Sequence, residues 1–170
     1  MEKKNVKIVV LGQTNVGSTS LIERYVNNIF HERKLTGNMF LFKKIKLNNN
    51  KEINVNLWDN ACNEISGKLK PIKILFKDLD GIALVYDVTN ESTLEDLNIL
   101  LQNIKEDISN KIPIILIGNK IDSDKIKVTT EKGKEFADKN GIYSFYEVSA
   151  KENINVKESF ECLIQKAYNF

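Results

Sequence analysis

The chain has few of the features that mark secreted, zinc-binding or membrane-spanning proteins. Its two cysteines, Cys62 and Cys162, are too few for a disulfide framework and too far apart for the close pairs of a zinc site. No apolar run approaches the about 18 residues that a spanning helix needs. The start of the chain lacks the cleavage region of a signal peptide, and neither end carries a lipidation motif. We therefore expect a cytoplasmic protein without a membrane anchor of its own in this sequence.

An excess of charge of one sign is also lacking. The 25 basic and 23 acidic residues leave a net charge of +2. This balance argues against a nucleic-acid-binding protein and against a polybasic membrane-binding surface. The only histidine, His31, is better interpreted as an exposed loop residue than as a catalytic base. With 170 residues, 42% of them hydrophobic, the chain can form the core of a single domain over residues 1–170.

Short β-branched runs alternate with helical stretches along the chain. The runs predict strands at 6–11, 39–47, 51–58, 82–86, 113–118 and 143–148. The stretches between them predict helices at 19–28, 92–109, 129–140 and 153–168. The second of these helices is expected to begin with a capping box, Ser92 to Glu95.

Two connections have their own signals. Asn48-Asn49-Asn50 predicts a hairpin turn, because Asn tolerates positive φ angles. Pro71 interrupts residues 63–79, which we expect to be irregular with a short helix.

The predicted fold is α/β, with a six-stranded, mostly parallel sheet, one antiparallel edge strand and about five flanking helices. Ligands of such folds bind beyond the carboxyl ends of the strands, here at 12–19, 59–64, 119–122 and 149–151.

The first of these loops resembles a phosphate-binding loop. Its sequence is Gly12-Gln13-Thr14-Asn15-Val16-Gly17-Ser18-Thr19, against the pattern G-x-x-x-x-G-K-[ST]. Both glycines and the final hydroxyl residue are present, but Ser18 occupies the lysine position. Backbone N–H groups of such a loop bind a diphosphate at the start of a helix. By itself the match also fits an ordinary glycine-rich turn.

Two later loops carry a family resemblance. They read Asn119-Lys120-Ile121-Asp122 and Ser149-Ala150-Lys151. These match the N-K-x-D and S-A-K motifs, so the chain resembles a Ras-superfamily small GTPase over almost its whole length. Within that superfamily it is most similar to Rab proteins, whose "IWD" and "VVYDVTN" runs resemble Leu57-Trp58-Asp59 and Leu84-Val85-Tyr86-Asp87-Val88-Thr89-Asn90.

The resemblance implies a guanine-nucleotide site with Mg²⁺. The Asp122 carboxylate can accept hydrogen bonds from guanine N1–H and N2–H, a donor pair that adenine lacks. The Lys120 stem would cover the base, the Ala150 N–H would meet O6, and Phe30 would pack at the base edge, unless it is an ordinary core aromatic. The candidate nucleotide-binding residues are Asn15, Val16, Gly17, Ser18, Thr19, Ser20, Phe30, Asn119, Lys120, Asp122, Ser149, Ala150 and Lys151.

The phosphate side departs from the family at several positions. The loop lysine is Ser18, and the run D-T-A-G-Q-E reads Asp59-Asn60-Ala61-Cys62-Asn63-Glu64. The glycine that contacts the γ-phosphate is thus Cys62, and the glutamine that orients water is the shorter Asn63, a degenerate catalytic position. Asn15 adds a side chain where glycine is usual. All four changes concern the γ-phosphate.

The implied magnesium residues are Thr19, Thr36 and Asp59, of which Asp59 makes the outer-shell contact. The resemblance places Thr36 at the magnesium-binding threonine of a switch segment that is one residue shorter than usual; an ordinary loop threonine is the alternative. Arg33 or Lys34, in the same segment, is a candidate to replace the missing lysine.

Three functions remain open from the sequence. The first is a Rab-like GDP/GTP-binding protein with impaired hydrolysis, which acts in vesicular traffic through effector or regulatory proteins of Rab type. The second is a nucleotide-independent interaction scaffold, and the third is a working GTPase with unusual phosphate contacts. We expect a monomer that does not bind nucleic acid. Rab proteins carry a cysteine-tipped tail, which this sequence lacks, so we expect it to reach endomembranes through partners or as part of a longer chain.

Overall fold

The computed structural model describes residues 5–32, 39–61, 64–65, 68–69, 76–108 and 112–169. Its main sheet has six strands in the order β2-β3-β1-β6-β7-β8. Strand β2 pairs antiparallel with β3, and the other neighbours pair in parallel. The expected sheet is therefore confirmed. Its strands are β1 Asn5–Gly12, β2 Met39–Lys46, β3 Glu52–Ala61, β6 Gly81–Asp87, β7 Ile114–Asn119 and β8 Ser144–Val148.

Four α-helices flank this sheet within the described residues. They are α1 Ser18–Asn27, α2 Glu91–Asp107, α3 Thr130–Asn140 and α4 Val156–Tyr168. The additional short helix expected within residues 63–79 falls largely on residues outside this description. The described parts of that segment include a small antiparallel pair, β4 Glu64–Ile65 and β5 Lys68–Leu69.

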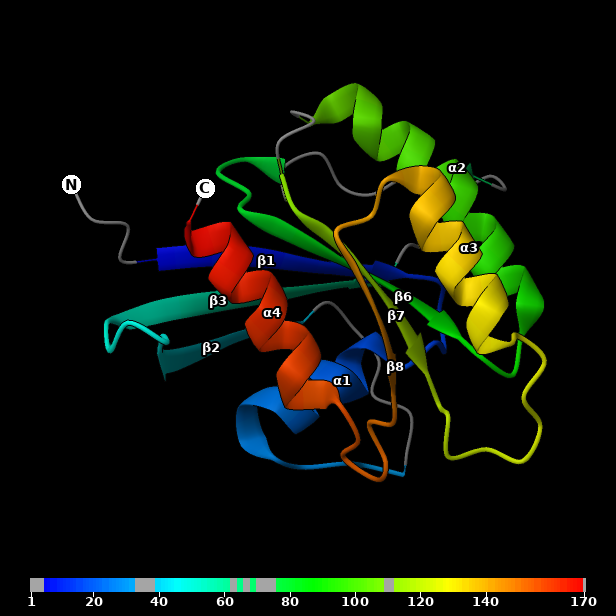
Figure 1. Cartoon of the computed structure of the whole chain (residues 1–170), viewed down its shortest axis with the longest axis horizontal. Helices are drawn as coiled ribbons and strands as arrows, with labels where there is room; N and C mark the ends of the chain where they lie inside the picture. Colours follow the sequence, from blue (N-terminus) through cyan, green and yellow to red (C-terminus); the bar gives the residue numbers. More distant parts are fainter. Residues whose placement is uncertain are drawn as a thin grey trace.

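The helices cover both faces of the sheet, with α1 and α4 on one and α2 and α3 on the other (Figure 1). Strand β1 shows why: because side chains alternate along a strand, Ile8 and Val10 pack with α1 and α4, whereas Val9 and Leu11 pack with α2 and α3. All four are fully buried. A strand buried on both faces explains the continuous apolar run that predicted it.

The helices start one residue away from the predicted position in α1, α2 and α3, and three residues away from it in α4. Helix α2 is capped by Asn90 rather than by Ser92, because the Asn90 side chain accepts a hydrogen bond from the Ser92 N–H. Helix α4 begins at Val156 rather than at 153, since Asn153 and Asn155 have left-handed backbone angles (φ +55° for each). The predicted stop of α3 at Gly141 is confirmed, with φ of +66°.

Strand β3 extends further than its apolar residues indicate. It continues past Trp58 to Ala61, because it pairs with β1 along its whole inner edge. Asp59 therefore lies on a strand, opposite Val10 of β1, and not in a loop as predicted. At its other end the hairpin turn is confirmed, with Asn50 at φ +65° and its N–H donating to the Leu47 carbonyl.

Within the described part of the chain, no helix combines the length and apolar character needed to cross a membrane.

Candidate functional site

The connection from β1 to α1 is a tight loop that depends on two left-handed residues. Asn15 has a φ of +71° and Gly17 a φ of +93°, and Ser18 then begins α1. Asn15 is exposed, whereas Ser18 is only 4% exposed. The first N–H groups of a helix have no intrahelical acceptor and carry partial positive charge, which favours an anion at this point. The loop thus has the position of a phosphate loop, with a serine in place of its lysine.

Asn119, at the end of β7, joins the phosphate loop to the loop after β8. Its side chain is 2% exposed. Its Nδ2 donates to the Val16 carbonyl at 2.9 Å, and its Oδ1 accepts from the Ala150 N–H at 3.2 Å. The asparagine therefore braces the two loops. In this structure, however, the Ala150 N–H that is expected to meet guanine O6 is directed to Asn119.

Lys120 is fixed between the phosphate loop and β6. It has a φ of +73°, and its Nζ donates to the Asn15 carbonyl at 2.6 Å and to Asp87 Oδ2 at 2.5 Å. Asp87 itself is nearly buried and accepts hydrogen bonds from the Thr89 N–H and hydroxyl through Oδ1. The ammonium group of Lys120 is thus engaged by a carbonyl and a carboxylate, which leaves its stem as the part that can cover a base.

Asp122 is exposed, but a buried hydroxyl group fixes the orientation of its carboxylate. The fully buried Ser149 donates from Oγ to Asp122 Oδ1 at 2.6 Å, and Ser149 Oγ accepts from the Glu152 N–H at 2.9 Å. These bonds fix the orientation of one carboxylate oxygen relative to the loop after β8. The two loops that carry the N-K-x-D and S-A-K sequences are therefore connected by side chains at two points.

A second cluster of oxygen atoms lies where α1 begins. Thr19 Oγ1 donates to Asp59 Oδ2, while Asp59 Oδ1 is buried and has no hydrogen-bond partner among the residues that the structure describes. Asp59 is 2% exposed. Burial raises the pKa of this carboxyl group, and hydrogen bonds from the Thr19 and Ser18 hydroxyls offset part of the effect.

These residues fit a magnesium ion. A buried carboxylate oxygen that no described residue bonds, next to a hydroxyl group, supplies the hard oxygen ligands that Mg²⁺ prefers. Among the described residues there is no group of three or more His, Cys, Asp or Glu side chains that could hold a metal. An ion held by Thr19 and Asp59 would therefore need further oxygen ligands, which phosphate groups can provide.

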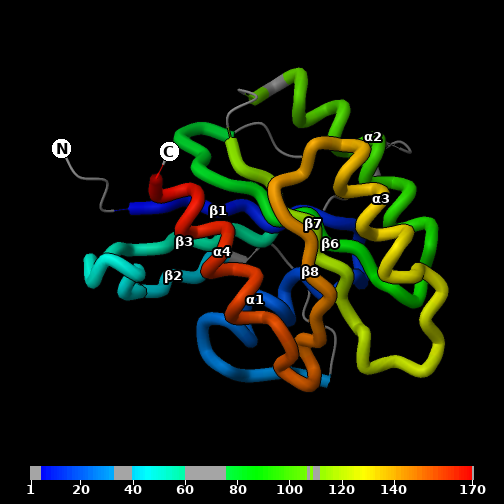
Figure 2. Tube along the Cα trace, viewed as in Figure 1, coloured from blue at the N-terminus to red at the C-terminus, as the bar shows by residue number. Residues whose placement is uncertain are grey.

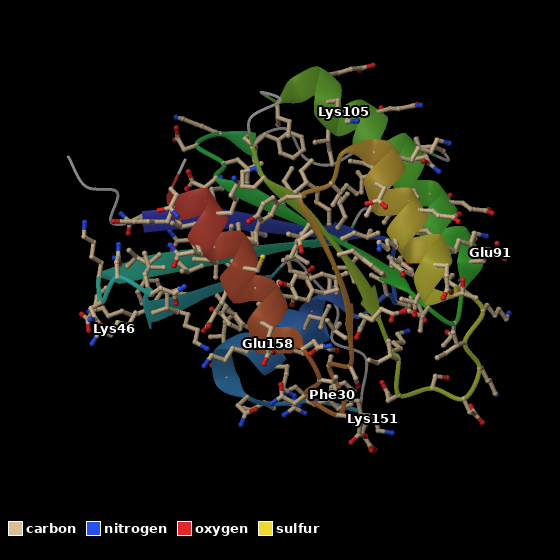
Figure 3. All side chains as sticks on the ribbon, in the orientation of Figure 1. Phe30, Lys46, Glu91, Lys105, Lys151 and Glu158 are labelled. Atoms are coloured by element: carbon tan, nitrogen blue, oxygen red, sulfur yellow. The ribbon has the colours of Figure 1, made fainter. Side chains whose placement is uncertain are left out.

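Phe30 and Lys151 lie at the same end of the molecule, as their labels in Figure 3 show, on the segments after α1 and after β8. Figure 2 shows these two segments close together at the lower edge of the view, and Asn153 Nδ2 donates to Asn28 Oδ1 between them at 3.4 Å. Phe30 is half-buried against the core, and Lys151 is exposed. Phe30 is thus partly a core residue, the alternative considered for it, while it also borders the loop after β8.

The remaining predicted positions divide into two groups. Val16 is buried and contributes its carbonyl to Asn119, and Ser20 is half-buried in the first turn of α1. The predictions for Thr36, Asn63 and Cys62, and for Arg33 and Lys34, concern residues outside those that the structure describes.

Two residues with clear roles in this network were missed as site candidates. Asp87 is the last residue of a buried strand. A carboxylate at this position indicates a ligand site, because ligands of this fold class bind beyond the carboxyl ends of the strands. Arg24, in α1, donates from Nε to the Ala150 carbonyl at 2.8 Å and from Nη2 to the Lys151 carbonyl at 2.9 Å. It reaches residues more than a hundred positions away, for which the local sequence contains no signal.

Comparison with known proteins agrees with this geometry. The family model described as "Ras family" matches residues 7–169. The chain is 35% identical to the Ras-related protein Rab-21 of Mus musculus over 156 residues, which cover 91% of this chain and 69% of that protein. It is 36% identical over 160 residues to the Ras-related protein RAB1BV of Beta vulgaris, covering 91% and 72%. It is also 34% identical over 175 residues to the GTP-binding protein yptV5 of Volvox carteri, covering 98% and 83%. The chain therefore belongs to the Ras family, and within that family it is a Rab-like small GTPase.

Proposed function

We propose that the chain binds guanine nucleotide as a Rab-like switch protein, retains GDP more readily than it processes GTP, and hydrolyses GTP very slowly or not at all. The observation that carries the proposal is the base-side network. Asn119 joins the phosphate loop to Ala150, while Ser149 fixes the Asp122 carboxylate. Such a network is useful for reading a guanine base, because a fixed carboxylate selects its paired N–H donors.

The phosphate side supports slow hydrolysis. A lysine at position 18 would place an ammonium group on the β- and γ-phosphates, and each such charge-assisted hydrogen bond contributes about 1.5–3 kcal/mol. Ser18 cannot replace it, and Lys120 is engaged by Asn15 and Asp87. Asn63 and Cys62 stand where glutamine and glycine assist γ-phosphate chemistry in the family. Binding is thus expected to be about ten- to a hundredfold weaker than with the lysine.

Mg²⁺ bound through Thr19 and Asp59, with Thr36 as a further proposed ligand, would neutralise phosphate charge at this end of the site. Asp59 accepts from Thr19, which orients the hydroxyl and the carboxylate toward each other. Asn15, Gly17 and the first residues of α1 would bind phosphate oxygens through their N–H groups.

The cellular role proposed is regulation of vesicular membrane traffic through effector or regulatory proteins of Rab type. It is supported by the similarity to Rab-21 and RAB1BV. We propose a cytoplasmic, monomeric protein that reaches endomembranes through partners or through a longer chain, and that does not bind nucleic acid.

A nucleotide-independent interaction scaffold is the second candidate. The observation that favours it is that the base-side groups bond to one another: the Ala150 N–H donates to Asn119, and Lys120 has two acceptors. A site whose groups already satisfy each other has less to gain from a ligand.

One experiment separates the two candidates. The purified protein is denatured in the presence of Mg²⁺, and the released nucleotides are identified by chromatography. Guanine nucleotide at near-stoichiometric amounts, mostly GDP, is expected, followed by little conversion of GTP in a single-turnover assay. A protein without nucleotide that also fails to bind added GDP would favour the scaffold, and turnover typical of small GTPases would show that hydrolysis is intact.

A further inference from the structure

Arg24 lies in the last part of α1 and holds the loop after β8 by its planar head. Its Nε donates to the Ala150 carbonyl at 2.8 Å, and its Nη2 donates to the Lys151 carbonyl at 2.9 Å. Because the guanidinium group is planar and rigid, two parallel bonds to successive carbonyls fix the course of that backbone as well as its distance. Arg24 thus determines how close the loop lies to α1.

The same side chain also organises the segment that follows α1. Arg24 Nη1 donates to the Asn28 carbonyl at 3.1 Å, at the residue that caps α1 with a φ of +56°. The guanidinium carbon of Arg24 lies 6.0 Å from the centre of the Phe30 ring, within the range of a cation–π contact. One residue therefore contacts both segments that border the proposed base position, the one that ends in Phe30 and the one that carries Ala150.

The geometry points to Arg24 as a positioning residue of the guanine site. It holds the loop of Ser149 to Lys151 and the Phe30 ring in the arrangement that receives the base, without contacting the base itself. This inference rests on the proposed binding of guanine nucleotide. It adds a residue that neither the sequence motifs nor the family comparison identify, and it assigns that residue to the base and not to the phosphates.

The placement of Arg24 along α1 gives this assignment a measurable consequence. Ser18 begins the helix, and Arg24 follows six residues later, which corresponds to about 9 Å at 1.5 Å per residue. At that distance most of the charge effect on a phosphate is screened by water and salt. Loss of Arg24 should therefore weaken the binding of GMP and of GDP by the same factor. A change at the phosphate loop would weaken the binding of GDP more than that of GMP.

The test measures the affinities of GMP and GDP for nucleotide-free protein in Mg²⁺ by calorimetry, for the full chain and for the variants Arg24→Gln and Arg24→Lys. We expect Arg24→Gln to lower the affinities for both nucleotides equally, by about ten- to a hundredfold, because it removes charge-assisted hydrogen bonds that order the loop. Arg24→Lys keeps the charge but not the two parallel bonds, so it should fall between Arg24→Gln and the unchanged chain.

Lys43→Met is the matched control. Lys43 also donates to a backbone carbonyl of α1, that of Tyr25 at 2.5 Å, and its Nζ lies 4.1 Å from the Tyr25 ring centre. These contacts are with α1 and not with the loop of Ser149 to Lys151, so the loss of Lys43 should leave both affinities within about twofold while it perturbs the same helix. Thermal unfolding without nucleotide checks the fold of each variant, and Arg24→Lys serves if Arg24→Gln does not fold.

Two results would overturn the inference: affinities for GMP and GDP that stay unchanged in the folded Arg24 variants, or a loss that is larger for GDP than for GMP. If the unchanged chain binds neither GMP nor GDP, the proposed function fails as a whole. That outcome differs from the one in which binding is present but independent of Arg24.

Discussion

Gly17 of the phosphate loop and Asn119 at the end of β7 lie so close that only a residue without a side chain fits at position 17. A Cβ on residue 17 would lie 2.4 Å from Asn119 Nδ2, an atom that donates to the Val16 carbonyl at 2.9 Å. The backbone at Gly17 also has a φ of +93°, which side-chain-bearing residues rarely adopt. Contact between the phosphate loop and the base-side asparagine therefore requires glycine for two separate reasons.

Gly17→Ala should destabilise the fold and disconnect the two loops. Backbone strain at this φ costs roughly 1–3 kcal/mol, and displacement of Asn119 adds the loss of a buried hydrogen bond of about 1 kcal/mol. Thermal unfolding of the nucleotide-free protein measures the sum. Gly141→Ala is the matched control, because Gly141 has a φ of +66° but no atom of the described residues within 4 Å of an added Cβ. Equal losses in the two variants would contradict the proposed clash with Asn119.

The sequence predicted the sheet and the base-side loops well, for a physical reason. Strands that are buried on both faces must be apolar along their length. Runs such as 6–11 and 113–118 can therefore be identified as strands without tertiary information. Polar residues directly after them, such as Asn119, are then conspicuous. The position of Asp122 next to Ser149 follows because parallel strands end at the same edge of the sheet.

Other features depend on contacts between distant parts of the chain, which no local sequence pattern predicts. Strand β3 continues through Asp59 because β1 supplies a pairing partner, although its last residues are polar. The cap of α2 is Asn90, because its side chain accepts from the Ser92 N–H, although the sequence also offers a capping box that begins at Ser92. Arg24 meets Ala150 only after the whole sheet has formed.

Asp122→Asn should abolish the preference for guanine. An amide at this position presents an N–H₂ group as well as a carbonyl, and so repels one of the paired donors of the base. We expect the affinity for GDP to fall by about a hundredfold or more, while xanthosine diphosphate, which has a carbonyl in place of the 2-amino group, binds better than GDP. Asp124→Asn, in the same exposed loop, is the control and should leave GDP binding unchanged. A variant that still prefers GDP would remove Asp122 from the base site.

Asp59→Asn should make the nucleotide-free protein more stable near pH 7. Burial raises the pKa of the Asp59 carboxyl group, so its ionisation is less favourable in the folded chain than in the unfolded one. The associated cost is present at neutral pH and disappears as the pH falls toward the ordinary carboxyl value of about 4. The melting temperature of the variant in chelator should exceed that of the unchanged chain near pH 7, and the two should converge near pH 4.

The same variant should bind nucleotide less well when Mg²⁺ is present, because it loses a carboxylate oxygen that has no partner in the described part of the chain and fits the metal. If the variant is more stable without nucleotide but binds nucleotide less well with Mg²⁺, the Asp59 charge serves ligand binding and not folding. If Asp59→Asn lowers the melting temperature at every pH, Asp59 is a structural residue of the β3 end instead.

Ser18→Lys should strengthen nucleotide binding in proportion to the number of phosphates. The restored ammonium group would add charge-assisted hydrogen bonds at the start of α1, and we expect GDP to bind about ten- to a hundredfold more tightly while guanosine binds as before. Equilibrium titrations with both ligands measure the effect. Asn27→Lys, which adds the same charge at the exposed end of α1, controls for net charge. Hydrolysis of GTP should stay slow in Ser18→Lys, since Asn63 is unchanged. An equal gain for guanosine and GDP would show that residue 18 acts on the fold and not on the phosphates.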